Sequence, residues 1–123
     1  MGREKAKGTS WETRIVNYLV HCGSTNAERR SLRGVADRGD IAGIIGVTIE
    51  AKNHGRVDMA TFLDQVKAAM ANAGTSIGFV WIKRRGRVGA EDGFVLMDGA
   101  IVVRLLQEAG YIPVPVPAEG PAS

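Results

Sequence analysis

The chain has 123 residues, of which 45% are hydrophobic and 24% are charged. These values are typical of an ordinary globular protein, and the length suffices for one domain with a substantial core. The single cysteine, Cys22, excludes an internal disulfide and is typical of a reducing compartment. The charged start MGREKAK does not resemble a signal peptide, and no apolar run approaches the roughly 20 residues needed to cross a membrane. We therefore expect a soluble cytoplasmic protein without membrane association.

The net charge is only +3, but the basic residues are clustered. The three clusters are Arg3, Lys5 and Lys7; Arg29, Arg30, Arg33 and Arg38; and Lys83, Arg84, Arg85 and Arg87. Clustered basic residues favour a polyanion as partner, although solvated surface charge is the common alternative. Contacts of this kind with phosphates position a nucleic acid without reading its sequence.

The N-terminal part of the chain is expected to form a basic arm and then a helix. Residues 1–8 are basic and contain glycine, and we interpret them as a flexible arm. A helix is predicted from about Ser10 to His21, because apolar residues recur there at steps of three and four. Thr9 and Glu12 have the spacing of a capping box at its start.

The rest of the chain alternates strands and helices. The predicted elements are a short strand around Ala27–Leu32, a hairpin over Asp40–Lys52, a helix from Asp58 to Ala73, strands at Ile77–Ile82 and Phe94–Met97, and a helix capped by Asp98. The tail, residues 113–123, has proline at alternate positions and cannot continue a helix or a central strand. This order, αβββαββα, predicts an α/β fold with a mixed central sheet flanked by helices.

The stretch DIAGIIGVTIEAK, residues 40–52, carries the most informative pattern of the sequence. Its odd-numbered residues from Ile41 onward are mainly apolar, whereas Asp40, Thr48, Glu50 and Lys52 occupy even positions. Alternation with a period of two indicates a strand with one face in a core and the other free for chemistry. If the chain reverses about Ile45, between two glycines, Asp40 lies opposite or diagonal to Glu50.

Two carboxylates and a lysine on one sheet face are the parts of a phosphodiester hydrolase. Mg²⁺ needs one or two carboxylates besides waters and substrate phosphate, and Asp40 and Glu50 supply that pair. The backbone carbonyl of Ala51 is a candidate further ligand, and Lys52 could hold a water or counter charge on a phosphate. A solvated hairpin face explains the same spacing without any function.

The sequence resembles the PD-(D/E)xK nuclease superfamily, and within it the archaeal- and phage-type Holliday junction resolvases. The resemblance covers roughly residues 7–83, and its ordered motifs are KGTSWETRIVNYL, GDIAGI, VTIEAKN, FLDQVKAAMANAG and SIGFVWIK. It implies a restriction-endonuclease-like αβββαβ core inside a single nuclease domain at 9–112, and a bacterial or phage-type cytoplasmic protein.

The resemblance also implies roles for individual residues. Asp40 and Glu50 become metal ligands, Lys52 the catalytic lysine, and Glu12 an acidic residue near the metal. The chain departs from the family pattern at Gly39, where the motif has its name-giving proline. This departure leaves Asp37 as an alternative to Asp40, and we prefer Asp40 because the apolar alternation begins directly after it.

Several further residues have a functional and a plain interpretation. Gln65 is a candidate neighbour of the site, since relatives often have a glutamine in this helix, but an exposed helix glutamine is the default. His54 and Asn53 follow the EAK motif and are candidate phosphate contacts, whereas loop histidines are usually solvated. Cys22 is expected to be a small buried hydrophobe, because no base partner for a nucleophile is evident.

The sequence therefore predicts a Mg²⁺-dependent, structure-selective DNA endonuclease, with Mn²⁺ able to substitute. The leading hypothesis is a Holliday junction resolvase acting as a homodimer, since symmetric cuts in a four-way junction need two sites related by a twofold axis. The alternatives are a nuclease of the same superfamily with another DNA substrate (nicked, branched or plain duplex) and a DNA-binding module that does not cleave.

Overall fold

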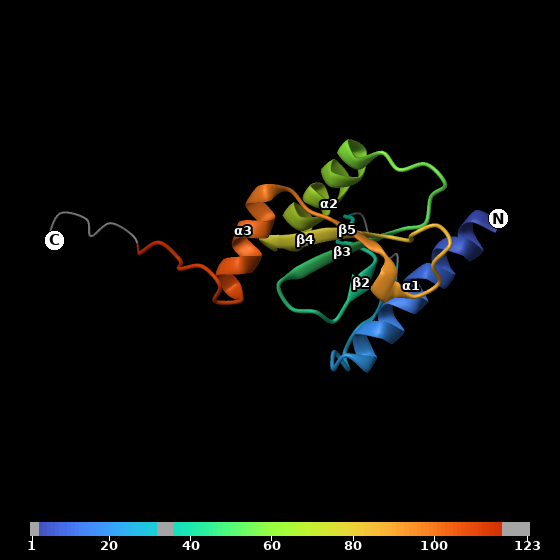
Figure 1. The fold of residues 1–123 in the computed structure, drawn as a ribbon, viewed down its shortest axis with the longest axis horizontal. Helices are drawn as coiled ribbons and strands as arrows, with labels where there is room; N and C mark the ends of the chain where they lie inside the picture. The colour runs from blue at the N-terminus through green and yellow to red at the C-terminus, as the bar shows by residue number, and fades with distance from the viewer. Residues whose placement is uncertain (1–2, 32–35, 117–123) are drawn as a thin grey trace, which may run out of the picture.

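The computed structural model describes residues 3–31 and 36–116, with side chains described from Ser10 onward within those ranges. The chain forms a mixed five-stranded sheet in the order β1-β2-β3-β4-β5, flanked by helices (Figure 1). The strands are β1 (Glu28–Arg29), β2 (Ile41–Ala42), β3 (Val47–Lys52), β4 (Ile77–Ile82) and β5 (Phe94–Leu96). The helices are α1 (Arg3–His21), α2 (Met59–Ala73), the short 3₁₀ helix η1 (Ala90–Asp92) and α3 (Gly99–Glu108). The predicted element order and the α/β class are confirmed.

The sheet is antiparallel except at its centre. Strands β3 and β4 run parallel, with Glu50 beside Val80, and helix α2 connects them. The neighbouring pairs β1–β2, β2–β3 and β4–β5 are antiparallel. In β2–β3, Ile41 pairs with Ile49, so the hairpin reverses about Ile45 as predicted.

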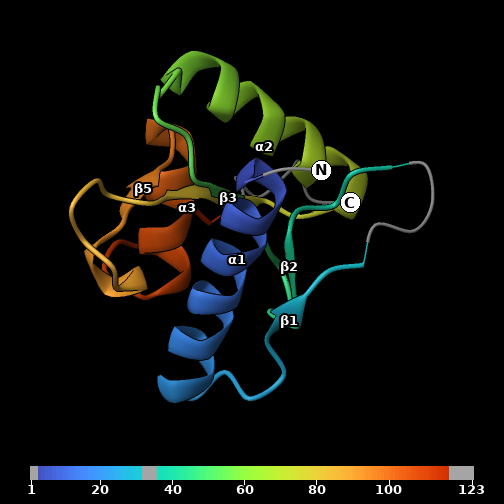
Figure 2. The same cartoon turned by 90° about the vertical axis from the view of Figure 1, so that its right-hand side faces the viewer.

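Helices α1 and α2 cover opposite faces of the sheet (Figures 1 and 2). On one face, Trp11 and Ile15 of α1 form a buried cluster with Ile41, Ile49 and Trp81. Trp11 is 1% exposed, and its indole N–H donates to the carbonyl oxygen of Trp81 at 3.0 Å. Both tryptophans therefore belong to the core.

The second face of the sheet is buried by α2. Phe62 and Val66 of α2 pack against Val80 and Ile82 of β4. Phe79 and Trp81 lie in the cluster with α1, whereas Val80 and Ile82 pack against α2, so burial on both faces explains the uniformly apolar sequence of this strand. A further cluster of Met70, Ile77 and Ile101 joins the end of α2 to α3.

Local capping signals define the ends of α2 and α3. The Asp58 carboxylate accepts a hydrogen bond from the Thr61 N–H at 3.1 Å, and Gly74 ends α2 in the left-handed conformation. The Asp98 carboxylate likewise accepts from the Ile101 N–H at 2.9 Å. Both N-caps agree with the sequence prediction.

The start of α1 differs from the prediction. The helix begins at Arg3, so residues 3–8, expected as an arm, are helical, and Thr9 lies inside the helix. The capping-box interpretation of Thr9 with Glu12 is therefore wrong. The segment REKAK consists of good helix formers, which extend the helix beyond the point where the apolar stripe begins.

The residue that follows the end of α1 also differs from the prediction. Cys22 is exposed after the end of α1, and its predicted burial is wrong because the apolar stripe of the helix ends before it.

Residues 111–116 form neither helix nor strand and lead away from the body of the molecule (Figure 1). Among the described residues, no helix combines the length and the apolar character required to span a membrane.

Two glycines of the β2–β3 turn provide a matched test of the hairpin. Gly43 and Gly46 both have positive φ, 93° and 82°, so alanine is strained at either position. A Cβ at Gly43 would lie 1.8 Å from the Asn26 carbonyl oxygen, whereas one at Gly46 meets nothing within 4 Å. We expect Gly46→Ala to lower the free energy of unfolding by about 1–2 kcal/mol, and Gly43→Ala to lower it by clearly more. Urea denaturation measures both, and equal losses would contradict the close approach of Gly43 to Asn26.

Candidate functional site

The polar residues of β3 lie on the sheet face that α2 covers. The Thr48 hydroxyl is 2.7 Å from that of Thr75, just beyond the end of α2. The Lys52 ammonium lies over the Phe62 ring of α2, 5.3 Å from its centroid. Glu50 lies between them at the same parity, so alternation places all three polar residues on this face. The predicted division of β3 into an apolar and a polar face is confirmed, but its polar face is largely covered by α2.

Asp40 is positioned where β2 begins. Its N–H donates to the Ile49 carbonyl oxygen at 2.8 Å, and its side-chain Oδ2 accepts a hydrogen bond from the Ala51 N–H at 2.7 Å. The Asp40 carboxylate thus takes the place of a backbone carbonyl acceptor for β3. It is held beside Ala51, which lies between Glu50 and Lys52. This geometry brings Asp40 and Glu50 together, as the hairpin register predicts.

Glu50 is the most unusual ionisable group of the site. Its side chain is buried, with 4% of the residue exposed, and its Oε1 atom has no hydrogen-bond partner among the described residues. Burial is the largest cause that raises the pKa of Glu50 to about 9, followed by the charge of Asp40 and a hydrogen bond to it, and then by Asp37. At neutral pH and without a cation nearby, this carboxyl therefore holds a proton.

Asp37 also belongs to this environment, although the sequence treats it only as an alternative to Asp40. It lies close enough to raise the pKa of Glu50, and its carboxylate accepts a hydrogen bond from the Gly39 N–H at 2.8 Å. The Asn72 side chain of α2 donates to its carbonyl oxygen at 2.8 Å, which fixes the segment against the helix. The structure therefore places both aspartates near Glu50.

The backbone conformation at position 39 explains why this residue is glycine. Gly39 has φ +97°, and its N–H is used in the hydrogen bond to Asp37. Proline has φ fixed near −65° and no N–H, so it is excluded on both counts. A Cβ at this position would also lie 2.9 Å from the Ile49 carbonyl oxygen. Glycine at this position is therefore required by the tight entry into β2.

Lys52 and His54 share one aromatic neighbour. The His54 ring meets the Phe62 ring edge-on at a centroid distance of 5.3 Å, on the residue that also carries the Lys52 ammonium. Lys52 takes part in no ion pair among the described residues, so its charge is available to a ligand. Phe62 thus positions two candidate site residues, whereas its sequence pattern indicates only a core residue.

No hydrogen bond or ion pair between described residues joins Glu12 or Gln65 to the carboxyl pair. Glu12 lies on α1 and pairs with Arg29 of β1 at 3.0 Å. Arg29, a predicted phosphate contact, is engaged in this ion pair. Gln65 is exposed on α2, as the plain interpretation expects.

The other arginines and lysines that were predicted to contact phosphate, where the structure describes them, lie in two regions. Arg30 and Arg38 line a pocket beside β3, whereas Lys83, Arg84, Arg85 and Arg87 lie at and beyond the end of β4. The Lys83 ammonium donates to the Arg87 carbonyl oxygen at 3.0 Å, and it lines a small pocket with Arg14 and Asn53. Arg14 was not among the predicted residues, because an isolated arginine on a helix gives no signal. Arg33 and the side chains of Lys5 and Lys7 lie outside the described residues.

The donor set suits a hard cation that keeps much of its water. Within residues 10–31 and 36–116, no group of three or more His, Cys, Asp or Glu is arranged to hold a metal ion. Mg²⁺ requires fewer, since one or two carboxylates with waters and substrate phosphate complete its shell. Asp40 and the unpartnered Oε1 atom of Glu50 provide such a pair, and a cation would relieve the unfavourable burial of a charged Glu50.

Comparisons of this chain with protein-family models, with curated proteins and with solved structures gave no match in any of the three.

Proposed function

We propose that this chain is a Mg²⁺-dependent DNA endonuclease that cleaves four-way junctions, built on a restriction-endonuclease-like core. The observation that carries the proposal is the buried Glu50 beside Asp40 and two residues before Lys52. Among the described residues, the Oε1 atom of Glu50 has no hydrogen-bond partner and Lys52 forms no ion pair. A solvated hairpin face would have no reason to bury a carboxyl against a second one at a cost in stability. The resemblance of the ordered sequence motifs to the PD-(D/E)xK nucleases supports the same assignment.

Each residue has a distinct task in this proposal. Asp40 and Glu50 hold the cation, which supplies a water of lowered pKa and neutralises charge on the phosphoryl oxygens when bound. Lys52 orients the attacking water and stabilises the negative charge that grows on the phosphate. The water oxygen bonds to phosphorus and releases a proton to solvent as the bond to the 3′ oxygen breaks, and the 3′ oxygen takes up a proton from solvent. The products are a 5′-phosphate and a 3′-hydroxyl.

Cleavage of a four-way junction by paired symmetric cuts requires two copies of the site. We therefore propose a homodimer with twofold symmetry. Apolar side chains remain exposed on α3, among them Val103 and Leu105, and this helix lies away from the carboxyl pair at the end of the sheet where β4 begins. An interface there would leave both sites open to DNA.

The test offers the purified protein a synthetic four-way junction, a matching linear duplex and a single strand. We expect paired nicks in the junction with Mg²⁺ or Mn²⁺, and none with EDTA, because the carboxyl pair requires a cation to act on phosphate. Cleavage of the plain duplex at a similar rate would replace the junction with another DNA substrate. Binding without cleavage in any divalent metal would leave only a DNA-binding module.

A further inference from the structure

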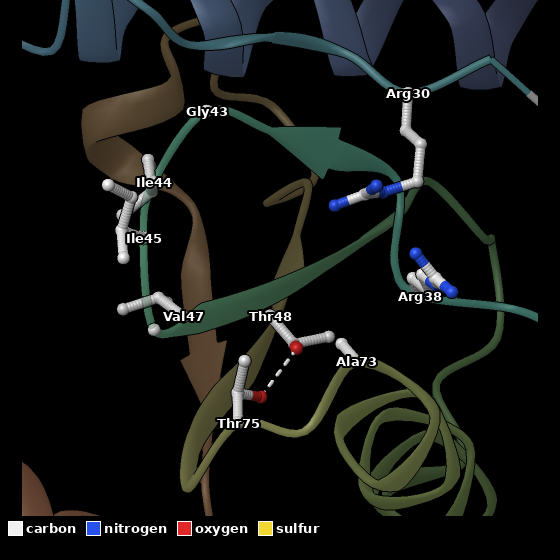
Figure 3. A pocket seen from close by; sticks show the side chains of 10 residues that line it. Arg30, Arg38, Gly43, Ile44, Ile45, Val47, Thr48, Ala73 and Thr75 are labelled. Carbon is white, nitrogen blue, oxygen red and sulfur yellow. Dashed lines mark hydrogen bonds between the residues drawn. The ribbon is translucent and has the colours of Figure 1, made fainter.

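A second polar site lies on the same sheet face as Glu50, near the end of α2. It is an open pocket of about 250 Å³ between the β2–β3 turn, strand β3 and the residues that follow α2 (Figure 3). Arg30 and Arg38 lie on the right of this view, Ile44 and Ile45 lie opposite them on the left, and the Thr48–Thr75 hydroxyl pair lies below (Figure 3). We call it the Arg30–Arg38 pocket.

Arg30 enters this pocket because its backbone is fixed next to the carboxyl pair. Its N–H donates to the Asp40 carbonyl oxygen at 2.8 Å, which continues the pairing of β1 with β2. The Nε atom of Arg30 is buried and has no hydrogen-bond partner among the described residues. A buried donor without a partner is unfavourable, so its retention points to a ligand that completes it.

No described carboxylate neutralises the two arginines. Neither Arg30 nor Arg38 forms an ion pair with another described residue. The two acidic residues nearest Arg38 in sequence direct an oxygen elsewhere, since Asp37 accepts from the Gly39 N–H and Asp40 from the Ala51 N–H. Two guanidinium groups in one pocket, neither of them paired with a described carboxylate, repel each other and favour an anion between them.

The C-terminal end of α2 opposes the binding of an anion in this pocket. Ala73 lines the pocket, so the carbonyl end of α2 is close, and this end carries about half a negative charge. The N–H groups of Gly74 and Thr75 already donate to the Met70 carbonyl oxygen, which satisfies part of that end. Two full positive charges therefore outweigh the helix end, and the pocket favours a compact anion with several acceptor oxygens.

We propose that the Arg30–Arg38 pocket binds a phosphate group of the DNA strand, at a position that is not cleaved. Arginine recognises phosphate through two parallel N–H bonds, and the hydroxyls of Thr48 and Thr75 can add donors. Thr48 precedes Glu50 by two residues, about 7 Å along a strand, which corresponds to about two axial steps of 3.4 Å in a DNA strand. The pocket then takes a phosphate within about two nucleotides of the one at the carboxyl pair. This spacing rests on the proposed nuclease function, whereas phosphate binding itself does not.

The first test measures binding of the four-way junction in EDTA, where no cleavage occurs, over a range of salt concentrations. We expect Arg38→Ala to weaken binding about tenfold and to lower the slope of log affinity against log salt by about one. Arg30→Lys, which retains the charge of the buried residue, should weaken binding because it loses the paired N–H geometry. Lys67→Ala is the control, since Lys67 lies on α2, does not line this pocket and pairs with Asp98 at 2.7 Å. Unchanged binding by Arg38→Ala, with circular dichroism showing a folded protein, would overturn the proposal.

The second test locates the phosphate. Single phosphates of the junction are replaced in turn by neutral methylphosphonates, and binding is measured for the wild type and for Arg38→Ala. One replacement should weaken wild-type binding and have no further effect on Arg38→Ala. If every replacement weakens both proteins equally, no single phosphate occupies the pocket and the proposal is wrong.

The same proteins distinguish the source of the phosphate and the fate of the nuclease proposal. Tight, Arg38-dependent binding of inorganic phosphate, together with Arg38-independent binding of DNA, would assign the pocket to a free phosphate and overturn the DNA assignment. A located DNA phosphate in a protein that cleaves nothing would support the pocket and refute the nuclease function. If the protein cleaves the junction but Arg38→Ala binds it as tightly as the wild type, the nuclease function is supported and the phosphate pocket is refuted.

Discussion

Replacing Glu50 by glutamine is expected to abolish cleavage of the four-way junction while leaving junction binding in EDTA unchanged. Glutamine has nearly the same shape and is neutral, as Glu50 itself is at neutral pH without a cation. It cannot become the second carboxylate ligand of a divalent ion, and loss of metal assistance costs several kcal/mol in the transition state. That loss corresponds to a rate lower by about 1,000-fold or more. Single-turnover cleavage with Mg²⁺ and binding by fluorescence anisotropy measure the two effects separately.

Two further variants make this experiment specific. Glu28→Gln alters an exposed glutamate on β1 and should cleave at the wild-type rate. Glu12→Gln separates the two interpretations of that residue: a fall in rate comparable to that of Glu50→Gln would place Glu12 at the metal. A small effect would leave it as the ion-pair partner of Arg29. Wild-type cleavage by Glu50→Gln would refute the proposed site.

The same glutamate is expected to make the metal-free protein less stable as the pH rises. The pKa of Glu50 is raised from 4.5 to about 9 in the folded protein, chiefly by burial. Between these values the unfolded chain loses the proton and the folded chain retains it, so the free energy of unfolding falls with increasing pH. The slope is about 1.36 kcal/mol per pH unit, or about 3 kcal/mol between pH 4.5 and pH 7. Urea denaturation at pH 5, 7 and 8.5 measures this loss.

Glu50→Gln provides the control for the pH dependence. The variant lacks the ionisation, so its stability should change much less over this range and should exceed that of the wild type at pH 8.5. Mg²⁺ or Mn²⁺ should raise the melting temperature of the wild type at pH 8.5, because a cation binds the ionised carboxylate, and should have little effect on Glu50→Gln. A wild-type stability that does not fall between pH 5 and pH 8.5 would show that Glu50 ionises normally.

The cleavage experiment and the stability experiment both test whether Glu50 is retained for catalysis at a cost in stability. A carboxyl that destabilises the fold and has an unpartnered buried oxygen is expected where function, rather than stability, determines the residue. If Glu50→Gln is both more stable at high pH and inactive, the residue is retained for catalysis. A variant that is more stable and fully active would leave the burial of Glu50 without explanation.

Patterns that are local in sequence determined much of this protein. The alternation from Ile41 to Lys52 fixed which β3 residues face each side of the sheet, because strand geometry has a period of two. Asp58 and Asp98 marked the starts of α2 and α3, because an N-cap needs only its own next turn. The predicted strand Ile77–Ile82 is uniformly apolar, a pattern typical of a strand buried on both faces, and this strand packs against α1 and α2.

Contacts between distant segments decided the rest. The sequence offered Asp37 and Asp40 as alternatives, and the folded chain brings both to Glu50. It offered no sign that Glu12 would pair with Arg29, since that contact depends on how α1 lies beside β1. The raised pKa of Glu50 arises from burial beneath α2 and from neighbours more than nine residues away. Alternation specifies the direction of a side chain, but only the packing of α2 and of the 37–40 segment fixes the solvent and charges that it meets.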